Sequence, residues 1–144
     1  YVTFRFELRF ALGAIVALLH DVTITVGMSA LLDKEFSLPI VAALLAIVGY
    51  SLNDTIVVFD RIRENLKGQK DAHLFPEITE KSLLQSFRRS INTSLSTLIV
   101  ISSMLIFFVS FEDLFSFFLA LALGIIVGTY SSLFVAPFLL LEWQ

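Results

Sequence analysis

Long runs of residues without a charged side chain dominate the hydrophobic pattern of this chain. The three longest runs, at 36–53, 90–111 and 114–141, contain 18, 22 and 28 residues. A helix needs about 20 mainly apolar residues to cross the hydrocarbon core of a bilayer. These runs predict membrane-spanning helices at about 38–59, 91–111 and 114–141. A further apolar stretch, at about 10–32, is interrupted only by His20 and Asp21 at its midpoint and predicts a fourth, which comes first in the chain. We expect an all-α fold, a polytopic membrane bundle of four transmembrane helices.

Short polar segments separate the first two predicted spans and the last two. Residues 33–35 form a charged turn after the first span, and residues 112–113 form a tight turn before the fourth. Such short connections make consecutive helices antiparallel. We interpret residues 1–9 as the end of a preceding span followed by a cytoplasmic turn.

The connection at 60–90 is long and highly charged, with 12 of the 23 charged residues of the chain. Residues 68–71 indicate a break, and a helix at 76–90 begins at Pro76. Its apolar residues share one stripe: Ile78, Leu83, Leu84, Phe87 and Ile91. We interpret this segment as an amphipathic helix that lies flat in the cytoplasmic membrane interface. A surface that docks a partner protein is the alternative.

The Lys and Arg residues indicate the orientation of the predicted spans. Nine of the ten flank the spans on one side, and only Lys34 lies on the other. The positive-inside rule places the rich side in the cytoplasm. Both ends of this segment are therefore expected to be cytoplasmic. The chain begins at Tyr1 without a leader pattern, so we expect it to be an internal piece of a longer protein.

Composition and charge exclude several classes of protein. Hydrophobic residues make up 57% of the chain and charged residues 16%, which is too few for the polar shell of a soluble domain. Cysteine is absent, which excludes disulfides, thiolate nucleophiles and Cys-based metal sites. The chain has two His residues, His20 in a predicted span and His73 in a loop. They do not form a cluster of ligands, so no metal site is expected. The net charge of −3 gives no indication of nucleic-acid binding.

Polar residues cluster inside the second predicted span, at 49–55. They include Ser51, Asn53, Asp54 and Thr55. An ionisable side chain within a span costs about 2.5–3.5 kcal/mol on insertion scales and by default marks a function. Asp54 lies about 9 Å inside the cytoplasmic boundary, given a rise of about 1.5 Å per residue. These residues are our candidates for a proton-coupling site.

Arg89, at the start of the third predicted span, is the natural counter-charge for Asp54. Thr93 follows one turn deeper, at nearly the depth of Asp54. Burial favours a neutral carboxylic acid, whereas a nearby guanidinium favours the carboxylate. Movement of Arg89 away from Asp54 would therefore drive proton uptake, and its return would drive release. A static ion pair that fastens two helices is the alternative, and both interpretations are open.

A second intramembrane polar site occurs midway along the first predicted span, at His20 and Asp21. Thr25 lies on the same helix face as Asp21. An interhelical hydrogen bond and a proton relay are both open interpretations for Asp21. His20 points to a different face, where a partner could lie.

The third and fourth predicted spans carry small residues and hydroxyl groups. Hydroxyl side chains along the third span either line a hydrated path or bond back to their own helix. Gly124 and Gly128 form a GxxxG pattern, which is typical of close helix packing in membranes. Pro137 predicts a kink near the end of the fourth span.

Two of these segments resemble motifs of the SecF family. They are LHDV at 19–22 and GYSLNDTIVVFDRIREN at 49–65. The similarity also takes in RFE at 5–7, the residues at 89–94 and the residues at 124–132, so it covers essentially the whole chain. The sister SecD proteins lack the NDT element, which here stands at 53–55, and this difference favours SecF.

The resemblance implies a fold and an activity. SecF proteins are RND-superfamily members with six spans, and this segment would supply spans three to six. Together with SecD, they use the proton-motive force to promote late preprotein translocation through the SecYEG channel. The implied location is the plasma (inner) membrane of the cell. The implied partners are SecD, SecYEG, the preprotein and the lipid bilayer, with YajC as a further candidate.

The resemblance also implies roles for individual residues. In the family, the Asp of the NDT element and the Arg that opens the next span belong to the proton pathway, together with the Thr four residues later. These roles fall on Asp54, Arg89 and Thr93. No enzymatic activity, catalytic residue or metal is implied, and the only energy source is the proton gradient.

Two other functions are considered alongside protein export. An RND-type proton-coupled transporter would move a lipid or small molecule through a groove between spans. A structural scaffold would use the same polar groups only to hold helices together.

Overall fold

The chain is almost entirely helical in a computed structural model that describes residues 2–67 and 71–143. Its elements are α1 (Val2–Leu31), α2 (Leu38–Leu66), η1 (Ala72–Leu74), α3 (Phe75–Phe107), α4 (Glu112–Tyr130), η2 (Ser131–Val135) and α5 (Ala136–Glu142). The expected break at 68–71 falls mostly on residues 68–70, which lie outside the described residues.

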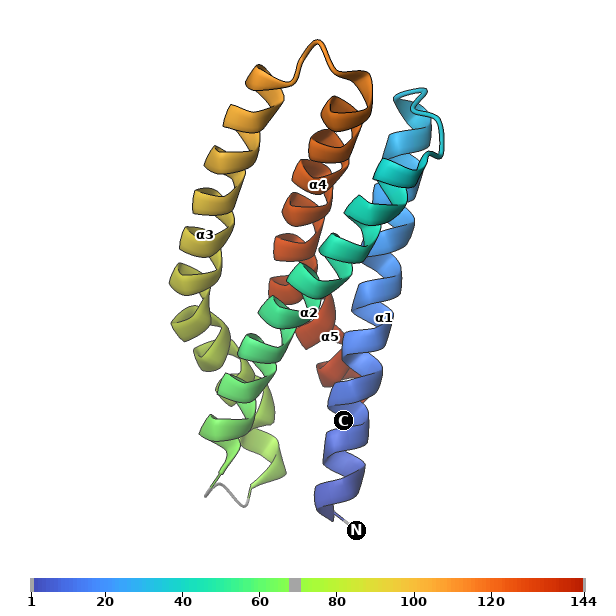
Figure 1. Ribbon diagram of the computed structural model, residues 1–144. Helices are drawn as coiled ribbons and strands as arrows, with labels where there is room; N and C mark the ends of the chain where they lie inside the picture. Colours follow the sequence, from blue (N-terminus) through green and yellow to red (C-terminus); the bar gives the residue numbers. More distant parts are fainter. Residues whose placement is uncertain (1, 68–70, 144) are drawn as a thin grey trace.

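Four helical segments are long and apolar enough to cross a membrane: Glu7–Leu31, Leu38–Leu66, Phe75–Phe107 and Glu112–Glu142. Successive segments run in opposite directions, and the two ends of the chain lie at the same end of the bundle (Figure 1). The all-α, multi-pass membrane architecture predicted from the sequence is confirmed.

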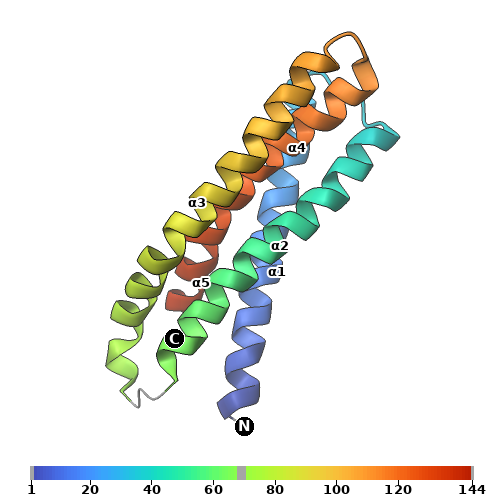
Figure 2. The same ribbon diagram turned by 60° about the vertical axis from the view of Figure 1, so that its left-hand side comes forward.

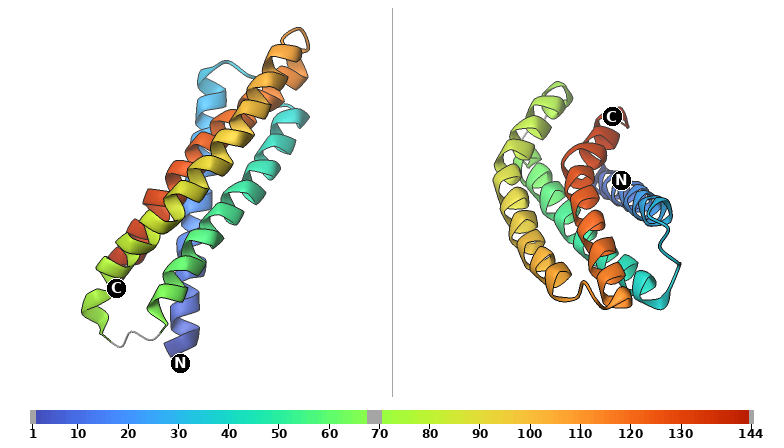
Figure 3. Two further views of the ribbon diagram at one scale, coloured as in Figure 1. Left: turned by 90° about the vertical axis from the view of Figure 1, so that its left-hand side faces the viewer. Right: turned by 90° about the horizontal axis from the view of Figure 1, so that it is seen from above.

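Helices α2 and α4 form the centre of the bundle and contact each other. Helix α1 packs on one side of this pair, and α3 packs on the other side (Figures 2 and 3). Residues on α2 can therefore meet α1, α3 and α4. This position explains why the polar cluster of α2 has partners on every side.

The apolar core lies toward the end of the bundle where the chain begins and finishes. Its members are Ala17, Val58, Phe59, Ile62, Phe75, Leu133, Ala136 and Leu140. The rings of Phe10 and Phe59 add an edge-to-face contact, with centroids 5.1 Å apart. Large apolar side chains also cover the outside of the bundle, for example Leu45 and Ile106. An apolar exterior of this kind suits contact with the hydrocarbon chains of a bilayer.

Helix α2 continues beyond the predicted span at 38–59, as far as Leu66. Polar contacts hold this extension against its neighbours. Arg63 donates to Glu7 of α1 at 2.7 Å, and the Asn65 amide donates to Ser82 of α3 at 2.8 Å. The added turns are stable because their charged groups have partners outside the apolar part of the bundle.

The segment at 76–90 does not form a separate helix lying in the interface. It is the first half of α3, which runs unbroken from Phe75 to Phe107. Leu84 and Phe87 of the expected stripe are 71% and 46% exposed. Ile78 of the stripe is buried, but from 82 onward the buried face is formed by small hydroxyl residues at four-residue spacing, which allow α3 to lie close to α2 and α4. These residues are Ser82, Ser86, Ser90 and Ser94.

Two of the expected turns lie elsewhere or do not occur. The turn between α3 and α4 is at 108–111, and Glu112 and Asp113 form the first turn of α4. Acidic side chains are stabilising there because the N-terminal end of a helix carries partial positive charge. The described part of 1–9 is a continuation of α1 rather than a cytoplasmic turn.

The fourth membrane segment changes its helical geometry shortly before Pro137. Residues Ser131–Val135 form a π-helical turn, in which the Ala136 amide bonds to the Ser131 carbonyl five residues earlier. Pro137 has no amide hydrogen to give to the carbonyl of Leu133, so the regular α-helical ladder cannot pass this point. The irregularity predicted at Pro137 therefore takes the form of a π turn that precedes it.

Candidate functional site

Asp54 is a buried carboxylate at the junction of α2, α3 and η2. Asp54 is only 9% exposed. The Ser90 hydroxyl of α3 donates to Oδ1 at 2.9 Å, and the Ser132 hydroxyl of η2 donates to Oδ2 at 2.7 Å. Neither donor carries a charge. Among the residues that the structure describes, Asp54 has no ion-pair partner.

Neutral hydroxyl donors alone hold the carboxyl group of Asp54. An ionised carboxylate without a cation is costly in a low-dielectric interior, whereas the neutral acid is tolerated. The two hydroxyl groups can donate to the ionised form, and a hydroxyl oxygen can also accept from the neutral form. Both carboxyl oxygens thus have a hydroxyl partner, and among the described residues no buried polar side-chain atom lacks one.

Arg89 lies beside this site, but no ion pair joins it to Asp54 in the described part of the chain. It is the residue before Ser90, so it stands at nearly the same depth but about 100° around α3. Its side chain lines a groove of about 290 Å³ between α2 and α3, together with Asp60, Glu64 and Ser86. Pairing of Arg89 with Asp54 stays a prediction.

The other predicted members of the site separate into a buried group and an exposed group. Ser51 and Thr55 are each 1% exposed and share the inner face of α2 with Asp54. Asn53 faces outward. Thr93 is exposed and its hydroxyl donates to the carbonyl of Arg89 at 2.9 Å. The structure therefore brings Ser51 and Thr55, but not Asn53 or Thr93, to the buried side of α2.

Asp21 is a second buried carboxylate, fully enclosed between α1, α2 and α4. Its Oδ2 atom accepts a short hydrogen bond from the Ser51 hydroxyl. Nδ1 of His20 lies 3.2 Å from its Oδ1 atom. The Thr25 hydroxyl donates to the Asp21 backbone carbonyl at 2.8 Å. Asp21 thus has an interhelical hydrogen bond, and its role as a proton relay stays a prediction.

Gly124 and Gly128 allow α4 to approach α2 closely. A Cβ atom at Gly124 would overlap with the side chain of Ile47. A Cβ atom at Gly128 would lie 3.4 Å from Cβ of Ser51 and 3.7 Å from Oδ2 of Asp21. The absence of side chains here leaves room for the hydrogen bond between Ser51 and Asp21.

A further hydroxyl network joins α2, α3 and α4. The Tyr50 hydroxyl bonds to the Ser94 hydroxyl at 2.9 Å, and Ser94 bonds in turn to the Thr129 hydroxyl. On the exposed side of α3 the hydroxyl groups bond back to their own helix, as Ser96 does to Asn92 and Ser103 to Ile99. The buried face of α3 therefore joins helices, whereas the exposed hydroxyl groups do not.

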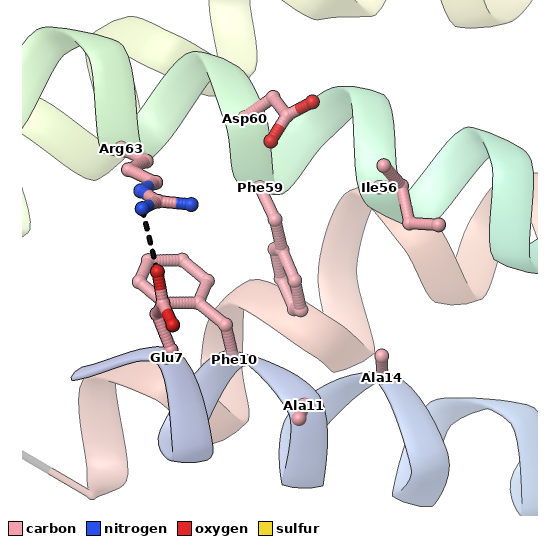
Figure 4. Close-up of a pocket in the computed structure, with 8 residues that line it drawn as sticks. All are labelled: Glu7, Phe10, Ala11, Ala14, Ile56, Phe59, Asp60 and Arg63. Carbon is pink, nitrogen blue, oxygen red and sulfur yellow. Dashed lines mark hydrogen bonds and ion pairs between the residues drawn. The ribbon is translucent and has the colours of Figure 1, made fainter. Parts of the chain in front are cut away.

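A cavity of about 390 Å³ lies between α1 and α2, away from Asp54. Figure 4 shows the ion pair between Glu7 and Arg63 at one end and the ring of Phe59 within. Most of its lining is apolar, so the cavity offers few groups for chemistry. Among the described residues, no cluster of His, Asp or Glu is able to hold a metal ion.

Ser90 and Ser132 are the two site residues that the sequence analysis did not select. The position of each in a four-residue repeat along its helix could have identified it. Ser90 lies in the run of serines at every fourth position of α3. Ser132 lies four residues after Gly128 and eight after Gly124, so all three share the face that packs on α2.

Comparison with known proteins identifies relatives along the whole chain. The family described as "Protein export membrane protein SecD/SecF, C-terminal" matches residues 1–144. Protein translocase subunit SecF of Calditerrivibrio nitroreducens is 53% identical over 137 residues, which are 94% of this chain and 44% of that protein. Protein translocase subunit SecDF of Thermus thermophilus is 48% identical, over 100% of this chain and 19% of that protein.

A solved structure shares both the sequence and the fold. The crystal structure of SecDF in its super-membrane-facing form is 49% identical to this chain and superimposes with a TM-score of 0.86. The match covers 99% of this chain and 19% of that protein. The chain spans less than half the length of these relatives.

Proposed function

Because the chain belongs to the SecD/SecF family of protein-export membrane proteins, we propose that it is the last membrane part of a SecF-type subunit that helps to drive protein export. The relatives named protein translocase subunit SecF favour this function over a lipid or small-molecule transporter. The structural observation that supports a proton-driven role is Asp54, a buried carboxylate without a cation at the junction of three helical elements.

In this proposal, proton exchange at Asp54 changes how α2, α3 and η2 are held together. The ionised form binds the hydroxyl groups of Ser90 and Ser132, or Arg89 if α3 turns. One proton that crosses a potential of 100 mV releases about 2.3 kcal/mol. This energy is enough to shift an equilibrium between two conformations, but a complete switch needs about 5.5 kcal/mol. We therefore expect several protons per transport cycle.

The proposed partners follow from the family. The SecDF relative, in which SecD and SecF form one chain, supports SecD as the direct neighbour in the membrane. We propose that SecYEG and the preprotein are further partners, with YajC as an additional candidate. The proposed location is the inner membrane, with both ends of this segment in the cytoplasm. The proton gradient is the only energy source in this proposal, and no catalytic role is assigned.

Protein export in membrane vesicles tests this function. The full-length protein and its SecD partner are compared with vesicles that lack both, with and without an uncoupler that collapses the proton gradient. We expect faster completion of preprotein translocation only when both the protein and the gradient are present. Gradient-driven uptake of a small molecule, with no effect on export, would favour the transporter alternative.

Replacement of Arg89 by Met should make the protein inactive in the same assay. Methionine keeps an unbranched, flexible side chain but lacks the guanidinium group, so Asp54 loses the counter-charge that would stabilise its ionised form. Arg88→Met is the matched control, because Arg88 is also exposed on α3 and lies one residue away. Full export activity of Arg89→Met would show that Asp54 does not need this guanidinium.

A further inference from the structure

The Ser132 hydroxyl lies within reach of two acceptors but has a single proton to donate. Its Oγ is 2.7 Å from Oδ2 of Asp54 and 3.0 Å from the backbone carbonyl oxygen of Thr129. Ser132 is fully buried. The two hydrogen bonds therefore compete for one hydrogen atom.

We propose that Ser132 is a positioning residue whose hydrogen bond changes with the protonation of Asp54. When Asp54 is ionised, Ser132 donates to Oδ2. When Asp54 holds a proton, Oδ2 donates to Ser132, and Ser132 donates to the Thr129 carbonyl. This inference rests on the proposed function, in which Asp54 exchanges protons.

The geometry specifies which carboxyl oxygen takes the proton. Ser90 donates to Oδ1 and has no second acceptor among the described residues. Its hydroxyl therefore donates to Oδ1 in both states, and Oδ1 remains an acceptor. Proton uptake forms one O–H bond at Oδ2, and the Ser132 hydroxyl rotates about its C–O bond. No other covalent bond forms or breaks.

The position of Ser132 in η2 connects this change to the shape of the last membrane segment. With Asp54 ionised, Ser132 fastens the π turn to α2. With Asp54 neutral, Ser132 bonds back to Thr129 at the end of α4, in its own helical segment. Hydroxyl groups that bond back to helix carbonyls alter the bend of the helix, and π turns occur frequently at functional sites.

On the last membrane segment, the partner of Asp54 is the hydroxyl group of Ser132 and not a charged side chain. The charged groups on the elements that pack here include Arg89 on α3 and Asp60 on α2, which line the groove, and Asp21 on α1, which binds Ser51. Residues 114–141, which include η2, contain no charged side chain. The charge state of Asp54 therefore reaches this segment through a hydroxyl group.

Infrared difference spectroscopy of the full-length protein with its partner subunit, in lipid vesicles, tests the inference. Spectra at low and high pH isolate the C=O stretch of protonated carboxylic acids, and the band that Asp54→Asn removes belongs to Asp54. A protonated acid that donates a hydrogen bond absorbs at a lower frequency than one that does not. We expect Ser132→Ala to shift the Asp54 band to higher frequency and to reduce gradient-driven export about tenfold, the equivalent of one hydrogen bond.

Matched variants separate this role from a packing defect. Ser132→Thr retains the hydroxyl and should restore both the band and export. Ser132→Cys replaces the hydroxyl with a weak donor of similar size, so it should shift the band even if the Ala variant does not insert. Ser131→Ala removes a neighbouring buried hydroxyl that bonds to the Ala17 carbonyl at 3.5 Å, and it should leave the Asp54 band unchanged.

The outcomes distinguish the inference from the proposed function. An unmoved Asp54 band in both Ser132→Ala and Ser132→Cys overturns the inference, even if export depends on Asp54. Absence of an Asp54 band at every pH also overturns it. A shifted band in a protein with no role in export supports the hydrogen-bond exchange and contradicts only the proposed function.

Discussion

Replacement of Asp54 by Asn abolishes export driven by the proton gradient, if the buried carboxyl group is where the proton binds. Asn has the shape of the protonated acid and retains an oxygen that accepts from Ser90, so the bundle should still insert and bind its partner. It cannot gain or lose a proton. One proton that crosses a potential of 100 mV releases about 2.3 kcal/mol, which is about 40-fold in an equilibrium constant. The Asn variant lacks this free energy in every transport cycle.

The measurement is the rate of preprotein translocation in vesicles, with protein levels and SecD binding checked in parallel. Asp113→Asn is the control, because it removes an exposed carboxylate from the first turn of α4. It should retain full activity. Export by Asp54→Asn at the unmodified rate, still sensitive to an uncoupler, would mean that the proton binds elsewhere.

Gly124→Ala should destabilise the bundle strongly. The added methyl group overlaps with the side chain of Ile47, which is fully buried and branched at Cβ. Branched side chains have few alternative rotamers, so the backbones of α2 and α4 must separate instead. Overpacking of this kind costs about 1–3 kcal/mol. We expect a lower unfolding temperature in detergent and less assembled protein in the membrane.

A second substitution identifies the cause of that loss. Ile47→Ala removes the atoms that overlap, so the double variant Gly124→Ala/Ile47→Ala should be more stable than the sum of the single changes predicts. Gly27→Ala is the control, because no atom lies within 4 Å of the added methyl group. Additive effects of the two changes would show that this contact does not limit packing.

The sequence predicted the spans well because an uncharged run of suitable length has one common structural outcome in a membrane protein. It did not predict how far the helices continue outside the membrane. Charged residues mark the edge of the apolar region, but they do not end a helix when partners are available. Arg63 has Glu7 of α1, and the polar Asn65 has Ser82 of α3, so the partners come from the two neighbouring helices rather than from α2 itself.

The sequence could predict how deep in the membrane the residues of the candidate site lie, but not which side of each helix faces the site. Asp54 and Asp21 stand out because carboxylates are rare in membrane spans, and the rise per residue placed Thr93, one turn inside Arg89, at nearly the depth of Asp54. In the structure Ser90, next to Arg89, is the residue of α3 that contacts Asp54. Which side of α3 faces Asp54 depends on packing. Ser90 faces inward because small residues at every fourth position let the helices approach, and this leaves Arg89 outside.

The serine face of α3 has a mechanical consequence. Its short side chains let α3 lie close to α2 and α4. The hydroxyl groups of Ser90 and Ser94 bond across to these two helices rather than to α3 itself. Successive residues of a helix stand about 100° apart, so Arg89 does not share that face with Ser90. Any movement of α3 along or around its axis would therefore have to break hydrogen bonds to two neighbouring helices at once.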